Sequence, residues 1–125
     1  MRHAMITTAL TLPGYKLTES HGICRGLVVR SRSIVGTAIG GIQSVFGGDI
    51  SVYTDLCEET RAEAYSIMSD HADQLGANAI ISMRYNSTEI MEGLTEVLCY
   101  GTAVTAVREG REGREARAPR EAQEE

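Results

Sequence analysis

The side chains best suited to binding a metal ion are a histidine and a cysteine three positions apart, His21 and Cys24. Imidazole and thiolate both suit Zn²⁺, Cu⁺ or Ni²⁺. Positions three apart in a regular strand point to opposite faces, so these side chains converge only if Gly22 forms a bulge or the segment bends. Two ligands are too few, and Cys99 or a neighbouring subunit would have to contribute. The alternative is a surface histidine and a buried cysteine without a metal.

A second cysteine and histidine, Cys57 and His71, fall on or near the apolar stripe of a predicted helix. They are 14 residues apart, which is about 21 Å along a helix axis, so they cannot share one ion within a subunit. We expect Cys57 to be a small core residue and His71 to be a packing or capping residue.

No motif for catalysis stands out. A cysteine nucleophile needs a neighbouring base, and no local signature supplies one. The carboxylates of Glu58, Glu59 and Glu63 belong to the predicted solvated face of the helix. The glycine-rich segment 31–48 contains neither of the two glycine patterns that bind nucleotide phosphates, Gly-x-x-x-x-Gly-Lys-Ser/Thr and Gly-x-Gly-x-x-Gly. The helical spacing of its apolar residues favours a short helix between glycine hinges. We expect this segment to be mobile or to lie at an interface. We therefore expect a protein that binds something and does not catalyse.

The helix that positions these residues is predicted from apolar periodicity. Asp49 or Ser51 caps its start, and Gly76 ends it in the left-handed conformation after roughly 22 residues. The predicted apolar stripe consists of Leu56, Cys57, Thr60, Ala64, Ile67, Met68 and Leu75.

Three strand-like segments, 15–30, 79–86 and 95–107, accompany the helix. Gly22 and Gly26 interrupt the first strand, which predicts bulges or bends. The last strand is partly apolar on both faces, and one face would stay in water unless another subunit covers it. Strict alternation predicts an apolar face on the second strand made by Ala79, Ile81, Met83 and Tyr85.

Composition limits the partners and the compartment. The stretch from Arg108 onward holds 5 of the 12 basic and 6 of the 17 acidic residues and has no large apolar side chain, which predicts a disordered, mixed-charge tail over 108–125. The remaining 7 basic and 11 acidic residues give the body a charge of −4, which argues against nucleic acid. We expect no membrane span, and three cysteines in an odd count favour reduced thiols in a cytoplasmic protein.

The order of short motifs along the chain resembles the YbjQ-like family, which carries a heavy-metal-binding label. The match covers roughly residues 5 to 107, which we treat as one domain, 1–107. The motifs are Thr7-Thr8, Leu12-Pro13-Gly14-Tyr15, Gly47-Gly48, Tyr53, Arg61, Ala64, Leu75-Gly76-Ala77-Asn78-Ala79, Glu96-Val97-Leu98 and Tyr100-Gly101-Thr102-Ala103-Val104.

The resemblance implies an α+β fold: a two-layer β-α-β-β subunit whose three-stranded antiparallel sheet packs on one long helix. It also implies a homopentamer, with extra short strands for oligomer assembly. Among the motif residues, Glu96, Tyr100 and Thr102 share one face of the last strand. Together with Asn78, they either line a pocket between subunits or satisfy buried backbone groups. We predict a binding module for a transition-metal ion or small ligand at a subunit interface; the alternative is a ring-shaped scaffold without metal.

Overall fold

The computed structural model describes residues 1–31 and 51–110. The glycine-rich segment predicted at 31–48 lies outside the described residues from position 32 onward, as does the predicted tail from position 111 onward. Asp49, one of the two predicted helix caps, is also outside them.

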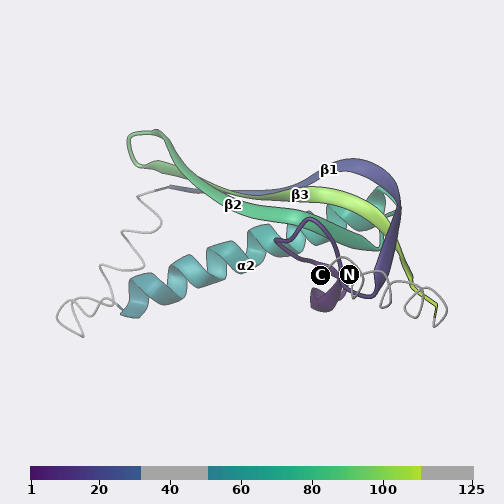
Figure 1. Ribbon diagram of the computed structural model, residues 1–125. Coiled ribbons are helices and arrows are strands. Elements are labelled where there is room, and N and C mark those ends of the chain that lie inside the picture. Colours follow the sequence, from purple (N-terminus) through teal and green to yellow (C-terminus); the bar gives the residue numbers. More distant parts are fainter. Residues whose placement is uncertain (32–50, 111–125) are drawn as a thin grey trace, which may run out of the picture.

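The described chain forms a short 3-10 turn, one long helix and three strands. Their bounds are η1 (His3–Met5), β1 (Tyr15–Ser31), α2 (Ser51–Gln74), β2 (Ala79–Met91) and β3 (Leu94–Arg108). The strands make an antiparallel sheet in the order β1-β3-β2, and α2 crosses one face of it (Figure 1). The predicted two-layer α+β fold is therefore confirmed.

Helix α2 ends where the sequence predicts. Gly76 takes a φ of +85°, and the Ala77 amide donates to the Ala72 carbonyl at 3.1 Å, which closes the last turn. The buried face of the helix is narrower than the predicted stripe and repeats every four residues. It consists of Thr60, Ala64, Met68 and Ala72, with Ser69 buried beside Met68.

Three residues of the predicted stripe, Cys57, Ile67 and Leu75, are exposed, so that part of the prediction is wrong. The helix lies near the sheet over its C-terminal half and diverges from it toward Ser51 (Figure 1). Cys57 is in the diverging part, and apolar periodicity does not record how far a helix face stays in contact with its sheet.

The closest contact between the two layers is at Gly26 of β1. A Cβ at this position would lie 1.9 Å from the Ala64 carbonyl oxygen and 2.5 Å from the Met68 amide nitrogen. The β1–β3 register runs through Gly26 without a shift, so there is no bulge here. The glycine is needed instead because helix backbone occupies the space of a side chain.

The predicted interruption at Gly22 is a bulge. The β1–β3 register shifts between Ser20 and Gly22, and Gly22 has a φ of +92°. His21 is the extra residue. A side chain on Gly22 would meet nothing within 4 Å, so the backbone conformation accounts for this glycine.

Strand β2 departs from the predicted alternation at a second bulge. The register shifts between Ile81 and Arg84, and Ser82 has a φ of +55°. The extra residue changes the phase of the strand: Ile80 and Met83 enter the core against the helix, while Ile81 packs with the other cluster. The single apolar face predicted from strict alternation is therefore wrong.

The apolar residues form two clusters, one on each side of the sheet. The larger lies between the sheet and α2 and contains Cys24, Met68 and Cys99. The smaller is built on Val104 and Ala106 of β3, and N-terminal residues such as Leu12 pack against it. The rest of that second face has no covering element within the described residues.

We predict that Gly26→Ala lowers the free energy of unfolding by about 3 kcal/mol, because the new methyl group meets helix backbone that cannot rotate away. For a domain of this size, that is a fall in Tm of roughly 10 to 20 °C, measurable by calorimetry. Gly110→Ala is the control, since a Cβ there meets nothing within 4 Å. Equal Tm values for the two variants would contradict the close contact.

Candidate functional site

The structure separates His21 from Cys24. The His21 Nε2 atom lies 2.6 Å from the Thr105 hydroxyl, and Glu19 is near it at 3.9 Å. Cys24 pairs with Gly101, four residues along β3 from Thr105, which corresponds to about 13 Å. The bulge at Gly22 therefore directs His21 to Thr105 and not to the cysteine.

The structure brings Cys24 and Cys99 together. Both are completely buried, and both belong to the cluster between the sheet and α2. In the β1–β3 register, Cys24 faces Gly101 and Gly26 faces Cys99, so the cysteines are diagonal neighbours on the helix side of the sheet. Neither neighbouring glycine adds a side chain between them.

Met68 of α2 completes a group that we call the sulfur cluster: Cys24, Met68 and Cys99. The Cys99 thiol donates to the Met68 thioether at 3.5 Å, and the Cys24 thiol donates to the Gly101 carbonyl at 3.6 Å. Met68 is completely buried. Sequence reasoning placed Met68 on the apolar stripe but not in the site, because thioether and leucine side chains give the same periodic signal.

Burial determines the protonation of the two thiols. Desolvation raises the pKa of Cys24, and it raises the pKa of Cys99 to about 11, with a side-chain hydrogen bond from Tyr85 acting in the opposite direction. Because the ordinary pKa is 9.0, the buried Cys99 thiol stabilises the fold up to about pH 9, and this contribution is lost as the pH approaches 11. At neutral pH both groups are uncharged thiols, unlike catalytic cysteines.

Two tyrosines lie beside the cluster. Burial is the largest cause of the raised pKa of both Tyr65 and Tyr85, and the charge of an ionised Cys99 adds to each. The Tyr65 hydroxyl is 2.8 Å from His3 Nδ1, and the Arg61 guanidinium lies over the Tyr85 ring, 5.4 Å from its centroid. Aromatic side chains thus separate the sulfur cluster from charged groups.

His71 packs against the edge of the sheet, in agreement with its predicted packing or capping role. Its Nδ1 accepts a hydrogen bond from the Arg25 backbone amide at 3.0 Å. Cys57 is exposed, which overturns its expected place in the core. It lines a cavity of about 250 Å³ between the N-terminal half of α2 and the sheet, beside Arg61 and Thr95.

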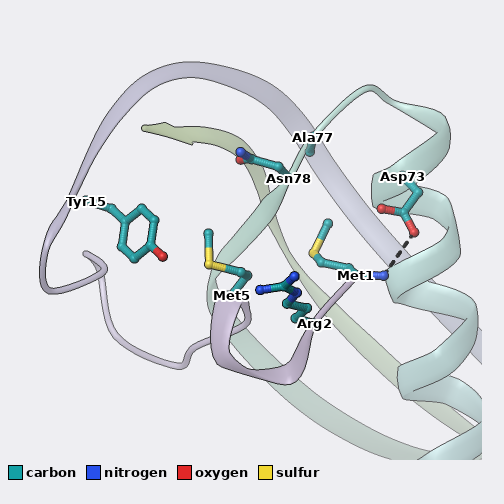
Figure 2. Close-up of a pocket in the computed structure, with 7 residues that line it drawn as sticks. All are labelled: Met1, Arg2, Met5, Tyr15, Asp73, Ala77 and Asn78. Carbon is teal, nitrogen blue, oxygen red and sulfur yellow. Dashed lines mark hydrogen bonds and ion pairs between the residues drawn. The ribbon is translucent and has the colours of Figure 1, made fainter. Parts of the chain in front are cut away.

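Asn78 satisfies backbone groups. Its Oδ1 accepts from the Ala106 amide at 2.7 Å, and its Nδ2 donates to the Ala106 carbonyl at 2.9 Å. Asn78 also lines a cavity of about 370 Å³, and Figure 2 shows the terminal ammonium of Met1 paired there with Asp73 at 3.3 Å. The other residues that line it are Arg2, Met5, Tyr15 and Ala77.

Glu96, Tyr100 and Thr102 alternate with Cys99 on β3, so they lie on the face of the sheet opposite α2. Tyr100 lies between Arg25 and Arg84 of the neighbouring strands. Neither cavity described above includes any of these three residues. Around them is an apolar surface, which we call the outer sheet face: Ile23, Leu27, Val29, Leu98 and Tyr100.

Conventional metal ligands do not gather in the described part of the chain. Among residues 1–31 and 51–110, no group of three or more histidine, cysteine, aspartate or glutamate side chains is arranged to hold an ion. Cys24 and Cys99 supply two potential sulfur ligands, and the Met68 thioether is the third. No helix in the same part of the chain is long and apolar enough to cross a membrane.

The chain is thus a small α+β protein in which one helix covers half of an antiparallel sheet and a pair of thiols is enclosed between them. A family model described as "Putative heavy-metal-binding" matches residues 4–107. The chain belongs to this family, the YbjQ family.

Similar proteins from bacteria carry a family designation. A UPF0145 protein of Chromobacterium violaceum is 60% identical over 100 residues, which are 80% of this chain and 86% of that protein. A UPF0145 protein of Solibacter usitatus is 59% identical over 102 residues, 82% of this chain and 91% of that one. A crystal structure of a DUF74-family protein of unknown function from Pediococcus pentosaceus has the same fold, with a TM-score of 0.52 at 18% identity over 82% of this chain and 96% of that one.

We predict that a maleimide reagent modifies the native protein at Cys57 and leaves Cys24 and Cys99 unmodified, because a buried, protonated thiol is both inaccessible and unreactive. Mass spectrometry should detect one adduct in buffer and three in denaturant. Cys57→Ser should show none in buffer. Rapid native modification of Cys24 or Cys99 would contradict the buried site.

Proposed function

We propose that this protein is a non-catalytic binding protein for a thiophilic metal ion, held by Cys24 and Cys99. The observation that carries the proposal is the juxtaposition of two completely buried thiols that are 75 positions apart in the sequence. Thiolates suit soft heavy-metal ions, which agrees with the description of the family. His21 is left out of the proposed site because it bonds to Thr105.

Each part of the chain has a separate task in this proposal. Cys24 and Cys99 lose their protons to solvent when the ion binds. The hydrogen bond from Tyr85 stabilises the ionised form of Cys99, in the way that second-shell donors tune metal ligands. The enclosing core keeps water from the ion. A bound ion would supply charge neutralisation of the thiolates and a cross-link between β1 and β3.

A binding role without catalysis is supported by the direction of the pKa shifts. Every resolved shift in the described residues is an increase at a cysteine or tyrosine, with burial as its largest cause. An activated nucleophile would need a shift in the opposite direction. The three unpaired thiols are also consistent with a reducing, cytoplasmic environment, and the −4 charge of the body is consistent with a partner other than nucleic acid.

We also propose that the protein is a homo-oligomer, with five copies as the family resemblance implies. The support is the outer sheet face, where Ile23 is 71% exposed, Leu27 48% and Val29 44%. Leu27 and Leu98 are register partners on this face with Val29 beside them, and exposed apolar side chains grouped in this way are typical of an interface. The same surface supports the second candidate function, a ring-shaped scaffold without metal.

We predict that untagged protein purified without chelator carries a transition metal, measured by elemental analysis. Cys24→Ser and Cys99→Ser should each lose the ion, because one remaining thiol cannot hold it. Cys57→Ser and His21→Ala are the controls and should keep it. Wild-type protein that remains metal-free after incubation with Cu⁺, Zn²⁺ and Ni²⁺ would overturn metal binding and favour the scaffold.

We predict that Leu27→Glu reduces the oligomer to smaller species in light scattering, because it buries a carboxylate at the centre of the outer sheet face. Ser66→Glu adds the same charge at an exposed position of α2 and should leave the mass unchanged. Unchanged mass in Leu27→Glu would exclude this face as the interface.

A further inference from the structure

Metal binding by the two thiols alone gives no role to the third sulfur of the cluster, that of Met68. The Met68 Sδ lies 3.5 Å from the Cys99 Sγ, and both residues are completely buried. A methionine could fill this part of the core simply by its shape. Its thioether, however, contacts the thiol of Cys99, and Cys99 is a diagonal neighbour of Cys24 on the helix side of the sheet. Three soft donor atoms therefore belong to one buried cluster between β1, β3 and α2.

The spacing of the two cysteines favours a bridging ion over a direct bond between them. Diagonal neighbours on adjacent antiparallel strands have Cα atoms about 7–8 Å apart, with Cβ atoms somewhat closer. A disulfide needs Cβ atoms about 3.5–4.5 Å apart. Two thiolates that each bind one ion at about 2.3 Å, the zinc–sulfur distance, hold their sulfurs about 4 Å apart when a third ligand shares the ion, which is wider than the about 2.0 Å of a disulfide bond.

We propose that Cys24, Cys99 and Met68 form a closed site selective for monovalent copper, in which the Met68 thioether is the selecting ligand. This inference rests on the proposed metal-binding function and names its metal and its third donor. Binding releases two protons, one from each thiol, and leaves a bis-thiolate copper centre with a net charge of −1. No electron is transferred, since the ion enters as Cu⁺.

The donor set explains the selection. Thiolate and thioether sulfur are soft ligands that select Cu⁺, whereas structural Zn²⁺ sites have four ligands drawn from cysteine, histidine and carboxylate. The described part of the chain offers no third residue of that kind at this place. Tyr85 is the register partner of Cys99, and the Arg61 guanidinium over its ring places a positive charge near the remaining negative charge.

The test is a competition titration of the full-length, reduced protein under anaerobic conditions. Cu⁺ is delivered from a coloured Cu⁺ chelator, and Zn²⁺ is titrated separately against a zinc indicator. We expect one Cu⁺ per chain and weak Zn²⁺ binding. Met68→Leu keeps the side-chain volume and removes the sulfur, and it should weaken Cu⁺ binding by about 10- to 100-fold. Met5→Leu, in the cluster on the other side of the sheet, is the matched control and should bind like wild type.

The outcomes separate this inference from the proposed function. Cu⁺ binding that is equal in wild type and Met68→Leu overturns the role of Met68 and leaves metal binding by the cysteines intact. Zn²⁺ binding as tight as Cu⁺ binding overturns the selectivity. Wild-type protein that binds neither ion overturns both proposals.

A measurement on the wild-type protein covers the case in which Met68→Leu does not fold. With methyl-¹³C methionine, the Met68 methyl resonance should move on addition of one equivalent of Cu⁺. The resonance of Met91, which is 64% exposed on the β2–β3 hairpin, should not. A Met68 resonance that stays in place while Cu⁺ binds would overturn its role as a ligand.

Discussion

The contact between Gly26 and the backbone of α2 is the constraint on which the rest of the structure depends. A Cβ at Gly26 would come within 1.9 Å of the Ala64 carbonyl oxygen, so the helix lies directly on strand backbone at this point. Gly26 is also the register partner of Cys99. The contact that seats the helix therefore brings Met68, whose amide is nearest to Gly26 after Ala64, over the Cys99 thiol. The same contact therefore determines both the position of the helix on the sheet and the assembly of the sulfur cluster.

Because the sulfur cluster forms where α2 packs on the sheet, the candidate site is in the core and not in a surface cavity. The two cavities described above lie elsewhere, one against the N-terminal turn and one beside the diverging end of α2. Burial raises the pKa of both thiols, which makes them poor nucleophiles, and an ion that binds here has to displace their protons. In the proposed function, this site would hold an ion and shield it from water. It offers no open position at which a substrate could react.

The sequence predicted the features that depend on local backbone chemistry. The helix stop at Gly76, the bulge at Gly22 and the order of elements are all confirmed. It failed where the outcome depends on contacts between elements. Strict alternation could not reveal the bulge at Ser82, because that left-handed position carries no glycine. Periodicity placed Cys57 in the core because it does not report that α2 leaves the sheet. The sequence indicated Cys99 only as one possible partner of Cys24, because the strand register that brings the two together cannot be read from the sequence. It did not indicate Met68 as a ligand.

In the proposed function, the ion is held by sulfur inside the fold. X-ray absorption spectroscopy at the copper edge of the Cu⁺-loaded, full-length protein tests it most directly. We predict a first coordination shell of sulfur alone, without the outer-shell scattering of an imidazole ring. A shell with nitrogen ligands and clear imidazole scattering would assign the ion to His21 or another histidine and would contradict the account.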